Sequence, residues 1–148
     1  MKKVQGLAVS KVLFATLSIS LIVVGIAQAQ MDLPVFTGKF TLTSQVEWGD
    51  AVLQPGDYTI IIESSSTLTV AQIRDGKGRA AGFVMGIDAG KTSARNALQV
   101  KQKGGRLRVY ALELASLGRT LVYDRALARE AVLESRAPQT VPVIVAKR

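Results

Sequence analysis

Residues 86–93, with the sequence GIDAGKTS, hold the residue types of a phosphate-binding loop, because they end in Gly-Lys-Thr. A nucleotide P-loop needs four residues between its two glycines and lies between a strand and a helix. Here only three residues separate Gly86 from Gly90, and the position that should hold the first glycine is Met85. The residues after Lys91 soon return to a strand pattern. We therefore predict a glycine-rich loop between two strands, and no nucleotide binding.

The chain contains no histidine and no cysteine, which excludes several classes of enzyme. No Ser-His-Asp triad, His-ligated metal site, thiol nucleophile or zinc–thiolate site can form. Asp75 and Asp88 lie beside glycines in predicted turns, where aspartate bonds its own backbone, and no calcium-loop spacing occurs. Paired carboxylates or a Ser-Lys site remain as alternatives, but no spacing points to either. The sequence thus predicts a non-enzymatic protein without a metal or cofactor.

A basic hairpin is the strongest candidate for a binding site. Residues 97–112 contain two strand-like runs around Gly104-Gly105, a pair that suits a two-residue type I′ turn. The register that this turn predicts places Lys103 opposite Arg106, Lys101 opposite Arg108 and Gln99 opposite Tyr110. One face of the hairpin is then apolar, with Leu98, Val100, Leu107, Val109 and Ala111.

The other face of this hairpin gathers four cations, Lys101, Lys103, Arg106 and Arg108. Like charges that face each other directly cost stability, so this face is not optimised for folding alone. An anion-binding site would gain from the arrangement, with Tyr110 available to stack on the ligand. The alternative is a solvated face whose charges keep the hairpin from pairing with other chains.

The segment LQPGDY, residues 53–58, predicts a structural corner. A tyrosine after a Pro-Gly turn, near the start of a strand, is typical of Greek-key sandwiches, where its hydroxyl bonds back to nearby backbone. The corner residues are Leu53, Pro55, Gly56 and Tyr58. The functional alternative is a sugar-stacking platform made by Tyr58 and Trp48.

Residues 1–29 have the three parts of a secretory signal peptide: a positively charged start, the apolar run 12–27 and a small-residue exit. We predict cleavage after Ala29, which exports residues 30–148 as a single domain to the periplasm or the exterior. The alternative is a membrane tether, since residues 12–31 carry no charge and approach the length that crosses a bilayer.

Strand patterns dominate residues 36–123. Runs rich in β-branched and aromatic residues alternate with Gly- and Pro-containing turns, at a spacing of roughly 8–12 residues. This pattern predicts an all-β protein, an antiparallel β-sandwich of Greek-key type. Residues 124–137 are rich in helix formers behind Asp124 as a possible N-cap, so we predict a short helix, with a strand as the alternative. Residues 139–148 predict a last strand, which Pro142 confines to a sheet edge.

The order of these features resembles a group of small exported bacterial proteins of unknown function. Residues 40–60, FTLTSQVEWGDAVLQPGDYTI, follow the pattern F-x-L…W-G-x-A-x-L-x-P-G-x-Y of that group. The basic Gly-turn hairpin, the segment LGRTLVYD and a Val-Pro-Val tail extend the likeness over nearly the whole mature chain. The resemblance implies a β-sandwich and offers no catalytic residues to carry over.

Together the patterns predict a non-enzymatic, disulfide-free interaction domain of the cell envelope that binds polyanions through the basic hairpin face. Residues 30–148 contain 16 of the 19 basic residues and all 11 acidic residues, and their net charge of +5 favours an anionic envelope polymer or a lipid surface as the partner. The hairpin hypothesis depends on register, because a slip of one residue would scatter the charges over both faces. A hydrolase-like enzyme and a membrane-tethered structural domain are the alternatives.

Overall fold

The computed structural model of the chain describes residues 34–63, 67–90, 93–134 and 139–146. All of them belong to one compact unit, Asp32–Arg148. The predicted signal peptide, residues 1–29, and its cleavage after Ala29 lie outside the described residues.

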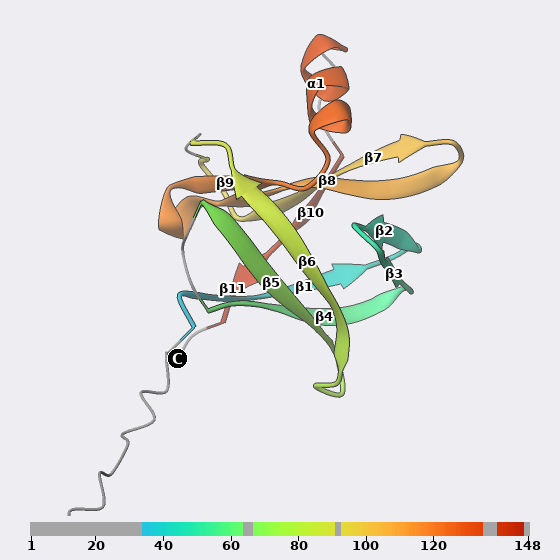
Figure 1. Cartoon of the computed structure of the whole chain (residues 1–148). Helices are drawn as coiled ribbons and strands as arrows, with labels where there is room; N and C mark the ends of the chain where they lie inside the picture. Colours follow the sequence, from blue (N-terminus) through green and yellow to red (C-terminus); the bar gives the residue numbers. More distant parts are fainter. Residues whose placement is uncertain (1–33, 64–66, 91–92, 135–138, 147–148) are drawn as a thin grey trace, which may run out of the picture. The chain divides into compact units, whose positions relative to one another are not determined.

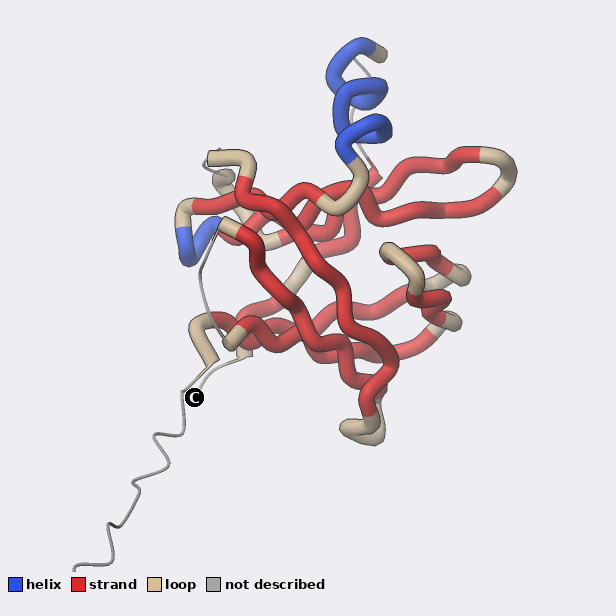
Figure 2. Tube along the Cα trace, viewed as in Figure 1, coloured by secondary structure: helices blue, strands red, loops and turns tan. Residues whose placement is uncertain are grey.

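Strands make up most of the described chain (Figures 1 and 2), so the prediction of an all-β protein is confirmed. The α-helix α1 (Arg125–Leu133) lies within residues 124–137, so the predicted short helix is confirmed. A 3-10 turn, η1 (Ala115–Leu117), lies directly before Gly118. The strands of the described residues are β1 (Phe36–Leu42), β2 (Val46–Trp48), β3 (Ala51–Leu53), β4 (Gly56–Ile62), β5 (Leu68–Asp75), β6 (Ala80–Asp88), β7 (Ala97–Lys103), β8 (Arg106–Leu114), β9 (Arg119–Val122), β10 (Gln139–Pro142) and β11 (Ile144–Val145).

The strands join one sheet in the order β10-β7-β8-β9-β6-β5-β4-β1-β11. The strands β2 and β3 form a small hairpin beside this path, because β2 also pairs with β8. Neighbours along the path are antiparallel, as predicted, whereas β2 and β8 run parallel, with Val46 opposite Leu107. The chain-adjacent strands β4, β5 and β6 pair in sequence, and only four residues separate β5 from β6.

The last two strands lie at opposite ends of this order, although only Val143 separates them in the chain. The strand β10 pairs with β7 as far as Pro142, and β11 pairs with β1. Pro142 has no N–H and cannot donate to the ladder. Instead the Val143 N–H donates to the Asn96 carbonyl oxygen at 2.9 Å. The C-terminal segment therefore ties both ends of the strand order together.

The main core contains an aromatic group around Trp48, which is fully buried. The Trp48 ring meets Phe40 and Tyr123 edge to face, with centroids 6.0 and 5.1 Å apart. Phe40 also stacks on Tyr58 at 5.6 Å. Alternate residues of β1 and β4 point into this core, as the period of a strand requires. Its aliphatic members include Leu42, Val46, Leu53, Ile60, Ile62, Ile73, Val84, Leu98, Val100, Val109, Leu112, Leu114, Leu121 and Val143.

Tyr58 makes the bond expected of a tyrosine corner. Its hydroxyl donates to the Gln54 carbonyl oxygen at 2.8 Å, four residues upstream. Leu53 is buried before the turn, and β4 begins at Gly56, directly after Pro55. The alternative of a sugar-stacking platform is wrong, because Trp48 is buried and has no exposed face to offer.

The segment that resembles a P-loop is the end of β6 and the turn after it. Gly86 lies in the strand, and a Cβ atom there would come within 2.8 Å of the Tyr123 ring, so close packing requires glycine. Asp88 Oδ1 accepts from the Gly90 N–H at 2.8 Å, which forms the turn. The next described element is the strand β7, as predicted. Residues 91–92 lie outside the described residues.

Candidate functional site

The β7–β8 hairpin has the predicted register next to its turn. Gly104 and Gly105 have left-handed φ angles of 60° and 77°, which a type I′ turn requires. The predicted cation pairs face each other, Lys101 with Arg108 and Lys103 with Arg106. The four cations of the predicted anion-binding face are therefore brought together.

Farther from the turn the register shifts by one residue. A bulge between Gln99 and Val100 places Gln99 opposite Ala111, so the predicted pairing of Gln99 with Tyr110 is wrong. A bulge gives one strand an extra residue and re-aims the side chains beyond it. Ala111 consequently leaves the apolar face predicted for it and joins a second cluster with Tyr110 and Leu127 of α1.

Tyr110 packs beneath α1, where 7% of its surface is exposed. Its hydroxyl donates to Gln99 Oε1 at 3.4 Å, and burial raises its pKa. The ring therefore belongs to the base of the helix and is not presented to solvent for stacking on a ligand.

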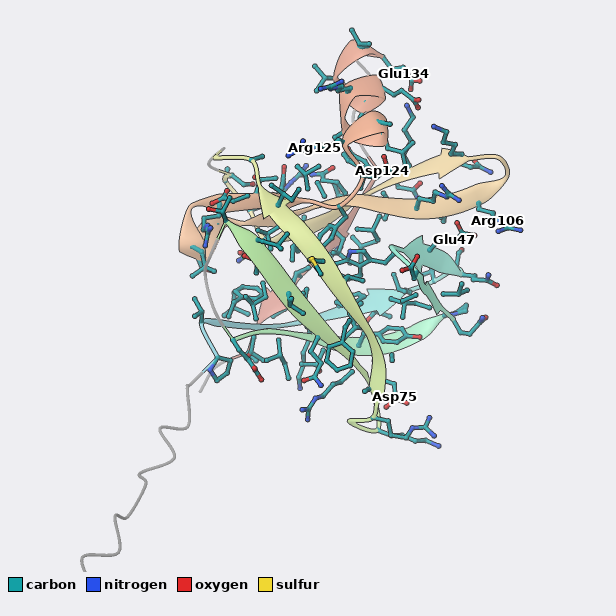
Figure 3. The ribbon with its side chains drawn as sticks, in the orientation of Figure 1. Glu47, Asp75, Arg106, Asp124, Arg125 and Glu134 are labelled. Carbon is teal, nitrogen blue, oxygen red and sulfur yellow. The ribbon has the colours of Figure 1, made fainter. Side chains whose placement is uncertain are left out.

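The two arginines of the hairpin hold one carboxylate from β2. Arg106 Nη1 lies 2.7 Å from Glu47 Oε1, and Arg108 Nε lies 2.8 Å from Glu47 Oε2. Figure 3 shows Glu47 and Arg106 close to each other beside the hairpin. The hydrogen bond from Arg106, helped by Arg108, lowers the Glu47 pKa below its ordinary value, so this carboxylate stays charged.

The two lysines of the hairpin form ion pairs with carboxylates near the C-terminal end of α1. Lys101 Nζ lies 2.9 Å from Glu134 Oε1 and 3.6 Å from Glu130 Oε2, and Lys103 Nζ lies 3.2 Å from Glu130 Oε1. The bond to Glu134 raises the Lys101 pKa, and the bond from Lys103 lowers the Glu130 pKa. Each of the four predicted cations thus forms an ion pair with a carboxylate of the same chain.

These partners explain what the like charges on the hairpin do in the fold. Three carboxylates, from β2 and from the end of α1, face four cations and reduce the repulsion between them. The lysines also fix the position of the helix, whose only fully buried side chain among the described residues is Leu127. The sequence gives no local signal for the ion pairs of Glu47, because Glu47 lies about sixty positions before Arg106 and Arg108.

A groove of about 540 Å³ lies on the other side of α1, between the helix and the ends of β6 and β9. The sheet side consists of Ile87, Asp88, Ala89 and Val122, and the helix side of Arg125, Ala128, Arg129, Val132 and Leu133. The helical members are spaced by three and four residues, which places them on one face. Sequence reasoning missed this groove because its two walls are far apart in the chain.

Arg125 and Arg129 line the groove and make no ion pair with any residue that the structure describes. They lie one helical turn apart, on the side of α1 away from the hairpin lysines. Figure 3 shows Arg125 and Glu134 on opposite sides of the helix. The helix therefore turns its carboxylates towards β7 and its arginines towards the groove.

Asp88 is the acidic residue that lines this groove, and its charge is already satisfied. Its carboxylate accepts from the Gly90 N–H, and its Oδ2 lies 2.6 Å from Arg119 Nη2. These two contacts, the backbone bond first, lower the Asp88 pKa. An anion that enters the groove therefore meets two uncompensated arginines and one compensated carboxylate.

A smaller cavity of about 300 Å³ is lined by the carboxylates Glu47, Asp50 and Asp124. Glu47 is held by two arginines, and Asp124 caps α1 by accepting from the Leu127 N–H at 3.0 Å. A general acid near neutral pH needs a raised pKa, whereas that of Glu47 is lowered. Two of the three carboxylates that line this cavity, Glu47 and Asp124, are therefore already engaged within the chain.

Comparison with known proteins adds no assignment, since the chain matches no protein-family model, no curated protein and no solved structure. Among the described residues, no three side chains of the metal-binding types cluster to hold an ion. Within the same residues, no helix has the length and apolarity needed to cross a membrane.

Proposed function

We propose that this chain is a non-enzymatic interaction domain of the cell envelope that binds anionic polymers or surfaces through the arginines of α1. The observation that carries the proposal is the pair Arg125 and Arg129. Each lacks a carboxylate partner in the described part of the chain, and both line the same groove. Two adjacent arginines without partners suit a phosphate- or carboxylate-bearing ligand.

The basic hairpin face is a second candidate for the same ligand class. Its four cations outnumber the three carboxylates that they meet, and the side chain of Arg106 is 70% exposed. Most of its charge is nevertheless used within the chain. The hairpin therefore contributes to the binding of anions mainly by positioning α1.

We also propose that the domain is exported and that its sheet forms two packed layers. The charge pattern of residues 1–29 supports export, and the resemblance of residues 40–60 to small exported bacterial proteins agrees with it. The pairing of the C-terminal segment with both β7 and β1 supports a sheet that folds over on itself as a Greek-key-like sandwich. A retained N-terminal tether stays an alternative, which an intact-mass measurement on the exported protein would decide.

The proposal is tested by titrating the purified protein with polyphosphate at several salt concentrations. The variant Arg125→Gln/Arg129→Gln removes the unpaired cations, and Lys39→Gln/Lys77→Gln makes the same charge change at exposed positions on β1 and in the β5–β6 turn. We expect the arginine variant to bind at least tenfold more weakly than the control and to show a smaller salt slope, because fewer counterions are released. Equal binding by the two variants would contradict the proposal.

A further inference from the structure

We propose that the groove beside α1 binds an anionic amphiphile, with one alkyl chain in the groove and a phosphate or carboxylate head at Arg125 and Arg129. This inference rests on the proposed function and names the ligand class of the same arginines. The size of the groove, about 540 Å³, lies within the range of roughly 300–1,000 Å³ that small-molecule sites occupy.

The walls of the groove are apolar where a chain would lie. Ile87 and Val122 form the sheet side, and Ala128, Val132 and Leu133 form much of the helix side. Val132 and Leu133 are 70% and 82% exposed, although they sit on the face of α1 that borders the sheet. An inorganic anion would leave these side chains in water, whereas an alkyl chain would cover them.

On the helix side of the groove, Arg125 lies at the start, Arg129 in the middle, and Val132 and Leu133 at the end. At 1.5 Å per residue, about 12 Å of helix separates Arg125 from Leu133, and about 6 Å separates Arg129 from Leu133. The head group of an amphiphile would therefore meet the first half of this helical face, and its chain would extend from there past Val132 and Leu133. Because Arg119 compensates Asp88, this carboxylate opposes an anionic head only weakly.

An apolar stripe on the sheet continues the groove. Ile87 shares the outer face of β6 with Met85 and Phe83, which are 59% and 63% exposed. On β5, Leu68 pairs with Ile87 and Val70 pairs with Met85, and both are about half exposed. Contiguous exposed apolar side chains mark surfaces that meet a ligand, a partner or a membrane. A stripe that leads from the groove favours a ligand with an acyl chain.

The direct test compares the binding of three probes to the full protein by calorimetry, each below its micelle concentration. Dodecyl phosphate carries both the head and the chain, butyl phosphate carries the head with a short chain, and dodecyl maltoside carries the chain with a neutral head. We expect dodecyl phosphate to bind at least tenfold more tightly than either of the others. Equal affinities for dodecyl and butyl phosphate would overturn the inference.

Two sets of variants separate this inference from the proposed function. Val132→Ser/Leu133→Ser changes exposed side chains of the groove, and Val52→Ser/Ile144→Ser makes a similar change at exposed positions outside it. We expect the first variant to bind dodecyl phosphate at least tenfold more weakly and polyphosphate equally well, and the second to behave as the wild type. Equal losses of dodecyl phosphate affinity in the two variants would overturn the inference. Unchanged polyphosphate binding in both variants would leave the proposed function intact.

A vesicle experiment distinguishes a membrane lipid from a free amphiphile as the source of the chain. Phosphatidylglycerol vesicles, with phosphatidylcholine vesicles as the neutral control, are sedimented with the wild type and with Val132→Ser/Leu133→Ser. Sedimentation that requires Val132 and Leu133 would identify a membrane lipid as the ligand. Sedimentation that does not require them, together with tight binding of monomeric dodecyl phosphate, would identify a free amphiphile.

Discussion

At the scale of single residues, the Glu47 carboxylate joins two strands that lie far apart in the sequence. It receives hydrogen bonds from Arg106 and Arg108, and these bonds hold its pKa below the ordinary value. A carboxyl group whose pKa is lower in the folded chain stabilises the fold above its ordinary pKa. This contribution to stability is lost as the pH falls through the pKa that the carboxyl group has in the folded state.

The variant Glu47→Gln should therefore lower the urea midpoint at pH 7, and the difference from the wild type should shrink towards pH 3, as the wild-type carboxylate becomes protonated. The control is Glu63→Gln, at an exposed position without an ion pair among the described residues. A difference in urea midpoint between Glu47→Gln and the wild type that does not change with pH would contradict the role of the carboxylate charge.

Two tyrosine hydroxyls of the main core should respond in different ways to removal. The Tyr58 hydroxyl donates to the Gln54 carbonyl, whereas the Tyr123 hydroxyl is buried without a hydrogen-bond partner in the described part of the chain. Tyr58→Phe should cost about 0.5–1.5 kcal/mol of unfolding free energy. Tyr123→Phe should be neutral or stabilising, because no bond is lost. Equal destabilisation in urea unfolding would refute the assignment of these partners.

At the scale of elements, α1 is held by few contacts, so its N-cap matters. The Asp124 carboxylate accepts from the Leu127 N–H, and Leu127 supplies the buried anchor of the helix. Asp124→Ala should cost about 0.5–2 kcal/mol of unfolding free energy and speed amide exchange over residues 127–133. Asp124→Ser should retain most of the stability, since serine also caps helices. Identical exchange rates in the two variants would show that the cap does not hold the helix.

The hairpin shows what sequence predicts within one element and where such prediction fails. Gly104 and Gly105 fixed the turn, and the register near the turn follows from it. The bulge near Gln99 could not be predicted, because period-two alternation of side chains gives no sign of an inserted residue. Its cause is tertiary: Tyr110 and Ala111 turn to meet Leu127 of a helix that lies later in the chain.

At the scale of the whole molecule, the C-terminal segment joins the two ends of the strand order, and Val143 is its buried residue. Val143→Ala should cost about 1.6 kcal/mol or more, since two buried carbons are removed at about 0.8 kcal/mol each. Ile144→Ala, at a neighbour that is 73% exposed, should stay within about 0.5 kcal/mol of the wild type. Equal effects of the two substitutions on urea unfolding would contradict this role of the segment.

The sequence predicted the strands, the helix and the corner, because each depends on local periodicity, turn residues or caps. The candidate site was predicted only in part. Four clustered cations were visible, but their partners Glu47, Glu130 and Glu134 lie on other elements. The groove was not predictable, since Ile87 and Val122 meet Arg125 and Arg129 only after the sheet has formed.

The central claim is that anions meet the face of α1 that carries Arg125 and Arg129, and not the hairpin. The most direct measurement is the change in backbone amide shifts as polyphosphate is added to isotope-labelled protein. The account predicts the largest changes at residues 87–89 and 122–133. Larger shift changes at residues 101–108, with the amide shifts of α1 unchanged, would contradict the account and assign the site to the basic hairpin.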